Sequence, residues 1–280
     1  MTRLSTTTSE IKPNSLEDKT PEIAEVSEDT IGDEFIFKAI GIIRGVVNFT
    51  EGQPTTVTIG QKQYPLFYAS RNRSALTGLQ QEVEKEPNST QRLIVYPKVI
   101  HFPKKNQAPK ISFQLVGFDR GREPNGISQY LEDNEFKLAG LWQFIPVCRV
   151  PCISIFRNRT EKLLKYLDSI DNPGIKVKAL KASHIPVLWK DSPVKPFRFN
   201  PKNQGEKKIR AFVQIKAVFL PHRDAFGFVA LLGVPTENPP KFLKPDKKDP
   251  AQLQQKSGGQ KSPQSSQQPR KKSTPSPKKN

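Results

Sequence analysis

One stretch of this sequence occurs twice, and the repeat limits the folds that the chain can adopt. The segment FKAIGII at positions 37–43 returns as FKLAGLW at positions 136–142. Both copies place a glycine among β-branched, aliphatic and aromatic side chains, which is typical of a bent β-strand. A pattern that recurs further along the chain indicates a repeated structural unit. The sequence therefore predicts that a β-rich unit is present twice.

Three shorter segments also recur in a second copy. The segment FQL at 113–115 has a counterpart VQI at 213–215, and PKKNQ at 103–107 has a counterpart PKNQ at 201–204, both at nearly the same offset as the first repeat. The segments YPLFY at 64–68 and IPVLW at 185–189 are further apart and require an insertion. These similarities favour a diverged duplication, with the third pair as the weakest support.

Residue patterns predict mainly strands, with one helix in each unit. In the first unit, strands are expected at 35–47, 55–59, 62–69, 92–102 and 110–120, and a helix within 71–86. In the second unit, strands are expected at 136–144, 175–180, 184–189, 208–220 and 225–234, and a helix at 160–169. Asn158 is the expected N-cap of that second helix. Pro97 is expected at a sheet edge or a bulge, because proline donates no ladder hydrogen bond.

Two glycines in the first long strand, Gly41 and Gly45, favour sharp bends of the kind that close a small barrel. We therefore expect a mainly β fold with short helices, a tandem of duplicated small OB-like β-barrels flanked by disordered tails. The OB-fold is one nucleic-acid-binding version of such a barrel. The expected units span residues 34–125 and 135–238. The alternative is a single mixed α+β domain made of two interlocked halves.

Charge is distributed unevenly along the 280 residues, whose formal net charge is +18. Residues 1–34 carry three basic and nine acidic side chains, a net charge of −6, and residues 241–280 carry eleven basic and two acidic ones, a net charge of +9. The remaining +15 lies on the expected folded body. Residues 1–33 and 241–280 are polar and lack an apolar period, so both are predicted to be disordered. A basic body attracts polyanions such as nucleic acid, although solubility alone can also explain it.

The sequence shows no sign of catalysis, a metal site, a cofactor or a membrane span. Cys148 and Cys152 have no further ligands at metal-binding spacing, so both are interpreted as small core residues. His222 and Asp224 lie in an expected turn, where Asp224 more plausibly bonds its own backbone than serves a catalytic histidine. No nucleotide-binding or nucleophile motif is present, and no window has eighteen consecutive apolar residues. We expect a non-enzymatic cytoplasmic protein without a cofactor.

Aromatic and basic residues alternate in two places, as in proteins that bind single-stranded nucleic acid. One place surrounds Tyr96, and the other is the segment KPFRF at 195–199. Strand alternation would send Phe197 and Phe199 to one face, where they could simply fill the core, and Arg198 to the other. The candidate nucleic-acid-binding residues are Lys98, Lys104, Lys105, Lys110, Lys195, Arg198, Lys202, Lys207, Lys208 and Arg210.

These features favour a protein that binds RNA or single-stranded DNA through its basic body and basic tail. RNA is preferred because no segment resembles a major-groove recognition helix. The alternative is a protein–protein adaptor or assembly factor that binds an acidic partner, with the charged ends regulating access. Attachment to an anionic membrane surface ranks last, because no amphipathic helix with a basic face is evident.

Overall fold

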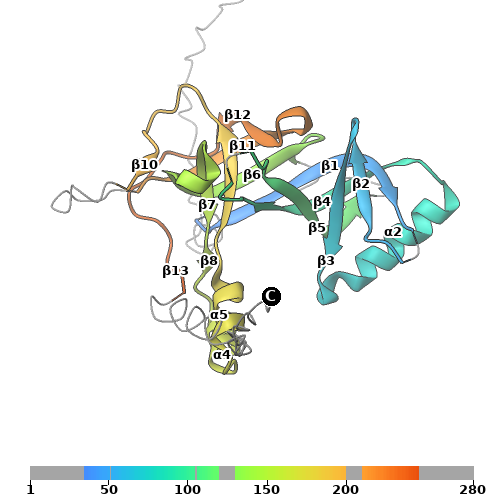
Figure 1. The fold of residues 1–280 in the computed structure, drawn as a ribbon, viewed down its shortest axis with the longest axis horizontal. Helices are drawn as coiled ribbons and strands as arrows, with labels where there is room; N and C mark the ends of the chain where they lie inside the picture. The colour runs from blue at the N-terminus through green and yellow to red at the C-terminus, as the bar shows by residue number, and fades with distance from the viewer. Residues whose placement is uncertain (1–34, 51, 105, 120–129, 200–209, 246–280) are drawn as a thin grey trace, which may run out of the picture. The chain divides into compact units, whose positions relative to one another are not determined.

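The computed structural model describes residues 35–50, 52–104, 106–119, 130–199 and 210–245. The two tails predicted to be disordered therefore lie outside the described residues, apart from the first five residues of the C-terminal one. Figure 1 shows that the described chain is dominated by β-strands.

The first five strands close into a barrel. They are β1 (Lys38–Asn48), β2 (Thr56–Ile59), β3 (Lys62–Tyr68), β4 (Thr90–Ile100) and β5 (Lys110–Asp119). β1 pairs with β2, β2 with β3, β3 with β5 in parallel, β5 with β4, and β4 with β1. We call this closed barrel the first ring. Since its inward side chains are apolar and alternate with outward ones, closure buries one face of every strand.

Helix α2 (Arg73–Lys85) follows β3 and the short turn η1 (Ser70–Asn72), and confirms the helix expected in this region. Its buried side chains Leu76 and Leu79 pack toward the ring, and the helix contacts β5. The helix thus lies between β3 and β4 in the sequence and packs against the outside of the first ring at β5.

Five later strands make a second ring of pairings. They are β6 (Glu135–Phe144), β7 (Pro151–Ile155), β9 (Ser183–Leu188), β11 (Phe212–Leu220) and β12 (Ala225–Leu231). β6 pairs with β7, β7 with β9, β9 with β12 in parallel, β12 with β11, and β11 with β6. We call this set the second ring. The shorter elements are η2 (Pro146–Cys148), β8 (Arg157–Asn158), α4 (Glu161–Asp168), α5 (Pro173–Leu180), β10 (Phe197–Arg198), η3 (Pro221–Arg223) and β13 (Phe242–Leu243).

Several local features occupy the same place in both rings. Pro65 lies opposite the second strand of the first ring, and Pro186 does so in the second ring, so the segments YPLFY and IPVLW coincide in register. The fourth and fifth strands of each ring also share a register shift, between Ile94 and Val95 and between Lys216 and Ala217. The segments FQL and VQI, in contrast, lie on the fifth strand of one ring and the fourth strand of the other.

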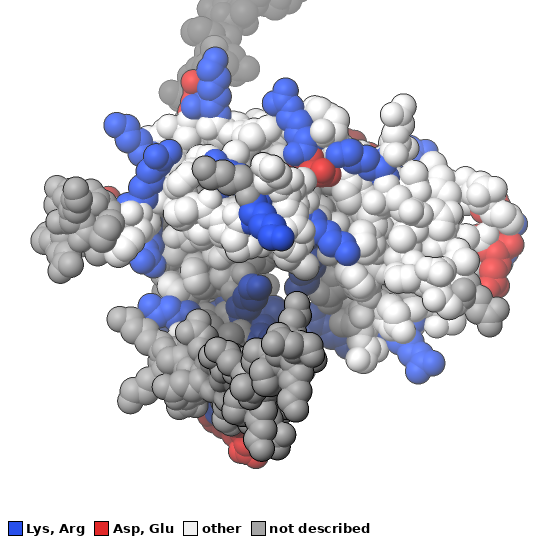
Figure 2. Space-filling model, in the orientation of Figure 1, with Lys and Arg blue, Asp and Glu red and all other residues white. Residues whose placement is uncertain are grey.

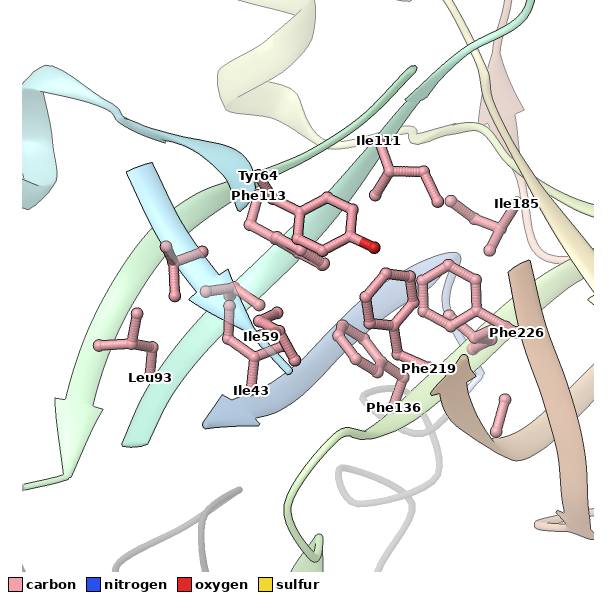
Figure 3. Packing of buried hydrophobic residues seen from close by; sticks show 14 of the residues in the cluster. Ile43, Ile59, Tyr64, Leu93, Ile111, Phe113, Phe136, Ile185, Phe219 and Phe226 are labelled. Atoms are coloured by element: carbon pink, nitrogen blue, oxygen red, sulfur yellow. The ribbon is translucent and has the colours of Figure 1, made fainter. Parts of the chain in front are cut away.

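The two rings are joined through their first strands. β1 pairs antiparallel with β6, and Gly41 lies directly opposite Phe136. The side chain of Phe136 is fully buried, and its ring packs 6.2 Å from that of Phe113 in the first ring and 5.0 Å from that of Phe226 in the second. Figure 3 shows these aromatic side chains gathered with aliphatic ones from both rings. The core is therefore continuous between the two rings, although the strands of each ring pair in a closed circle.

The strand expected at 175–180 is wrong, because this segment forms helix α5. Pro173 begins the helix, where a missing N–H costs nothing, and the side chain of Asn172 accepts a hydrogen bond from the N–H of Gly174 at 2.8 Å. Pro173 and Gly174 lie beyond the end of α4 and form the first turn of this new helix. Helix α4 matches the expected helix at 160–169.

The N-cap of α4 is Thr160 and not Asn158 as expected from the sequence. Thr160 Oγ1 accepts a hydrogen bond from the N–H of Leu163 at 3.3 Å. The amide of Asn158 instead forms two hydrogen bonds with the backbone of Phe37, at 2.8 and 2.9 Å. Pro97 lies at a sheet edge, as expected. β4 pairs with β1 only as far as Val95, so one side of β4 has no β1 partner at Pro97.

Candidate nucleic-acid interface

An aromatic and polar row crosses the outer face of the first ring. Phe67 of β3 lies opposite Gln114 of β5, and Gln114 lies opposite Tyr96 of β4. Their neighbours along the strands, such as Leu66 and Leu115, are buried in the barrel, so alternation directs this row outward. Phe67 is 50% exposed, and Tyr96 is half-buried.

Two predicted binding residues lie on this same outer face. Lys98 is two residues beyond Tyr96 and opposite Ser112, and the exposed Lys110 begins β5 opposite Ile100. Among the described residues, neither lysine makes a salt bridge, whereas Arg92 of β4 does so with Asp119 of β5. We call Phe67, Gln114, Tyr96, Lys98 and Lys110 the first-ring face. The pairing of β3, β5 and β4 thus places the aromatic side chain of Phe67 on the same face as two lysines that lie more than thirty residues further along the chain.

A further cation lies close to Lys98. Burial lowers the pKa of Lys98 below its ordinary value, and the nearby guanidinium of Arg157 on β8 lowers it further. Arg157 Nε donates to the carbonyl of Ala179 at 3.0 Å and makes no described salt bridge. A bound anion would relieve the repulsion between these two cations. Figure 2 shows Lys and Arg side chains set back in the hollow beside the first ring.

The loop after β4 contacts the second ring. The exposed Lys104 accepts a hydrogen bond at its carbonyl oxygen from the guanidinium of Arg149, in the turn between β6 and β7. His101 Nε2 lies 2.8 Å from the carbonyl oxygen of His184 on β9. These contacts fix the loop that carries Lys104. Lys105, predicted beside it, lies outside the described residues.

His184 is a half-buried neutral group and not a cation of this surface. Its Nδ1 lies 2.8 Å from the hydroxyl of Ser154, which also accepts from the amide of Gln143 at 2.5 Å. Burial is the main cause that lowers the pKa of His184 to about 4, and His101 and Lys181 add repulsion. The imidazole therefore belongs to a hydrogen-bonded network beneath the surface.

The second predicted group gathers around β10, which pairs in parallel with β6. The guanidinium carbon of Arg198 lies 4.3 Å from the centre of the Phe144 ring, and that of Arg210 lies 5.1 Å from the Phe197 ring. Such cation–π contacts hold the guanidinium groups flat while leaving their N–H donors available. Lys195 is exposed just before β10. Lys202, Lys207 and Lys208 lie outside the described residues.

Phe197 and Phe199 do not fill the core together. Phe197 is half-buried beneath Arg210, whereas Phe199 is 64% exposed. β10 ends at Arg198, so strand alternation does not extend to Phe199. Arg198 is exposed, as alternation predicted.

Sequence reasoning missed one end of the first-ring face. Phe67 is part of a repeated segment in the sequence, and the exposed Arg71 in η1 and Arg73 at the start of α2 follow it. A signal was available: the sequence contains no Asp or Glu between Glu51 and Glu82. The basic residues that border Phe67 therefore have no acidic neighbour along the chain, and the first turn of α2 carries no acidic residue.

Asp224 holds the two rings together, and does not bond its own backbone as expected. Its carboxylate accepts from the hydroxyl of Tyr64 at 3.1 Å and from Lys62 Nζ at 3.0 Å, both on β3. Burial and then the charge of Asp224 raise the pKa of Tyr64, which stays protonated and can donate this bond. The turn after β11 thus contacts β3, just as the loop after β4 contacts β9.

Both cysteines are buried, reduced thiols, which confirms their expected place in the core. Cys152 Sγ donates to the carbonyl of Gln143 at 3.4 Å. A hydrogen bond between the two thiols raises the pKa of Cys148 and lowers that of Cys152. In the described part of the chain, no three His, Cys, Asp or Glu side chains gather as metal ligands would. No described helix combines the length and apolar character needed to cross a membrane.

The chain matches no model of a known protein family, and no curated protein resembles it significantly in sequence.

Proposed function

We propose that this protein is a non-enzymatic nucleic-acid-binding protein that takes RNA or single-stranded DNA. The first-ring face carries this proposal, because it combines two lysines that lack described salt bridges with two outward aromatic rings. Phosphates need nearby cations, and unstacked bases need flat apolar surfaces. The +15 net charge of residues 35–240 adds a long-range attraction for a polyanion.

The barrel itself supports an OB-like fold for this function. In the first ring, the pairing order β1–β2–β3–β5–β4 closes a five-stranded barrel, with helix α2 between the third and fourth strands. OB-folds are small barrels that bind oligonucleotides on the face of their second and third strands and the adjoining loops. The first-ring face includes the third strand but extends across β5 and β4 instead of β2. We infer the same ancestry for the second ring, which shares the pairing order and the position of the register shift. Its helices follow the second strand instead of the third.

The direct test is fluorescence anisotropy of a labelled single-stranded RNA at two salt concentrations. The full chain is compared with a version that ends at Pro240 and with a variant carrying Lys98→Gln and Lys110→Gln. Lys85→Gln is the matched control, because Lys85 is an exposed lysine on α2 whose ion pair with Glu82 lies within the same helix. We expect tight, salt-sensitive binding that survives loss of the tail.

The double variant should weaken binding and reduce the slope of log affinity against log salt by about 1.4, since each lost phosphate contact to a single strand accounts for about 0.7. The control should bind as the unmodified chain does. Weak binding that does not respond to salt would refute the proposal. Binding that disappears with the tail would make the nucleic acid an incidental polyanion and redirect the search to an acidic protein partner.

A further inference from the structure

The two rings present different residues at corresponding places on their outer faces. Leu188 of β9 lies opposite Gly227 of β12, and Gly227 lies opposite Val218 of β11, which reproduces the row formed by Phe67, Gln114 and Tyr96. The corresponding pairs are Phe67 and Leu188, Gln114 and Gly227, Tyr96 and Val218, and Lys98 and Leu220. The second ring therefore has aliphatic residues where the first ring has aromatic and basic ones.

The first-ring row is suited to splayed bases. Phe67 and Tyr96 are separated by the one strand that carries Gln114, which places them about 10 Å apart across the sheet. The aromatic side chains of Phe67 and Tyr96 can each stack on one base. The amide of Gln114, which lies between them, can both donate a hydrogen bond to a base edge and accept one from it. Lys98 and Lys110 lie further along the same face, at a position suited to the phosphates.

The second ring cannot supply the same surface. Trp189 follows Leu188 directly, but its indole is stacked on the ring of Phe228, with centres 4.4 Å apart and planes only 4° from parallel. Trp142 packs against Trp189 as well, with centres 5.4 Å apart. The aromatic faces at this end of the second ring are therefore already used within the protein.

We propose that the chain binds single-stranded nucleic acid at one site only, the first-ring face, with bases stacked on Phe67 and Tyr96 and phosphates held by Lys98 and Lys110. Among the described residues, the corresponding row of the second ring is aliphatic and offers no equivalent base-stacking site. The second ring fixes the loop carrying Lys104, and the cations around β10 are assigned no base-stacking role. This inference rests on the proposed function and adds the base-stacking residues, the single-stranded state of the RNA and the number of sites.

The chain contains two tryptophans, Trp142 and Trp189, and both belong to the second ring. Their fluorescence therefore reports on that ring. Saturation with a short single-stranded RNA should leave this emission nearly unchanged in the unmodified protein. In a Phe67→Trp variant the added emission should be quenched by the bases. Titration should end at one short oligonucleotide per chain.

Exchange of corresponding residues provides a matched pair of variants. Phe67→Leu gives the first ring the residue of the second and should weaken single-strand binding by about tenfold or more, since it removes one base stack. Leu188→Phe makes the reverse change and should leave affinity within about twofold, because no lysine accompanies it. Binding of a duplex with equal charge should change little in either variant, because its bases cannot splay. Thermal unfolding checks that both variants are folded.

The outcomes separate this inference from the proposed function. Salt-sensitive binding with unchanged affinity in Phe67→Leu would refute the stacking site while leaving nucleic-acid binding intact. Strong quenching of the two native tryptophans, or two oligonucleotides per chain, would refute the single site. No binding of any nucleic acid by the full chain would refute both.

Discussion

Substitution of Gly140 by alanine tests how tightly the second ring is closed. A Cβ at this position would lie 2.5 Å from the carbonyl oxygen of Ser154 and 2.9 Å from side-chain carbons of Ile153 and Ile155. The first obstacle is backbone of β7, so relief requires β7 to move away from β6. That movement weakens the pairing of Leu141 with Ser154.

The expected cost follows from two opposing effects. Overpacking of a close contact costs about 1–3 kcal/mol, and a weakened ladder hydrogen bond adds about 1 kcal/mol. Replacing glycine stiffens the unfolded chain and returns about 0.4–1 kcal/mol. The net loss in the free energy of unfolding is therefore about 2 kcal/mol. With a urea dependence of about 2 kcal/mol per molar, the midpoint of unfolding should fall by about 1 M.

Urea unfolding followed by tryptophan emission measures this shift, because Trp142 lies on the same strand. Gly117→Ala is the control: a Cβ there meets only Ile94 Cδ1, at 3.7 Å. This variant should unfold within about 0.5 kcal/mol of the unmodified protein or slightly later. Equal midpoints for Gly140→Ala and Gly117→Ala would refute the close approach of β6 and β7.

Three further predictions concern stability and chemistry. His184 has a pKa lowered to about 4, so it stabilises the fold fully above its unfolded pKa of about 6.5. That contribution, about 3 kcal/mol at most, should be lost as the pH falls from 6.5 toward 4. Urea midpoints across this range should show the loss, and a His184→Gln variant with an unchanged pH dependence would contradict it. Asp224→Ala should lower the free energy of unfolding by about 2 kcal/mol, because Tyr64 and Lys62 lose the charged acceptor that they share, although the Tyr64 hydroxyl keeps the carbonyl of Pro221 at 3.2 Å. Asp224→Asn should recover most of the loss, and equal midpoints for all three proteins would count against the link between the rings. Cys148 and Cys152 should react with iodoacetamide only in denaturant, and rapid labelling of the native protein would show that the thiols are accessible.

The sequence by itself determined most of the local structure. Alternating β-branched residues located most strands of both rings, and the apolar spacing within 71–86 located α2. Local composition also placed the positive charge on the body as well as on the tail. These features depend on neighbours a few residues apart, so a linear reading can find them. The strand expected at 175–180 failed for a local reason, since Pro173 and Gly174 suit the first turn of a helix as well as a break.

The composition of the candidate site was decided only by the tertiary structure. Lys98 and Lys110 were identified from sequence, but their association with Phe67 depends on the pairing of β3, β5 and β4. The contact of Asp224 with Tyr64 likewise joins residues from different rings. Parallel pairing and barrel closure connect segments tens of residues apart, and their register is set by which faces can be buried together. A linear sequence shows which residues can face outward, whereas the closed sheet decides which of them meet.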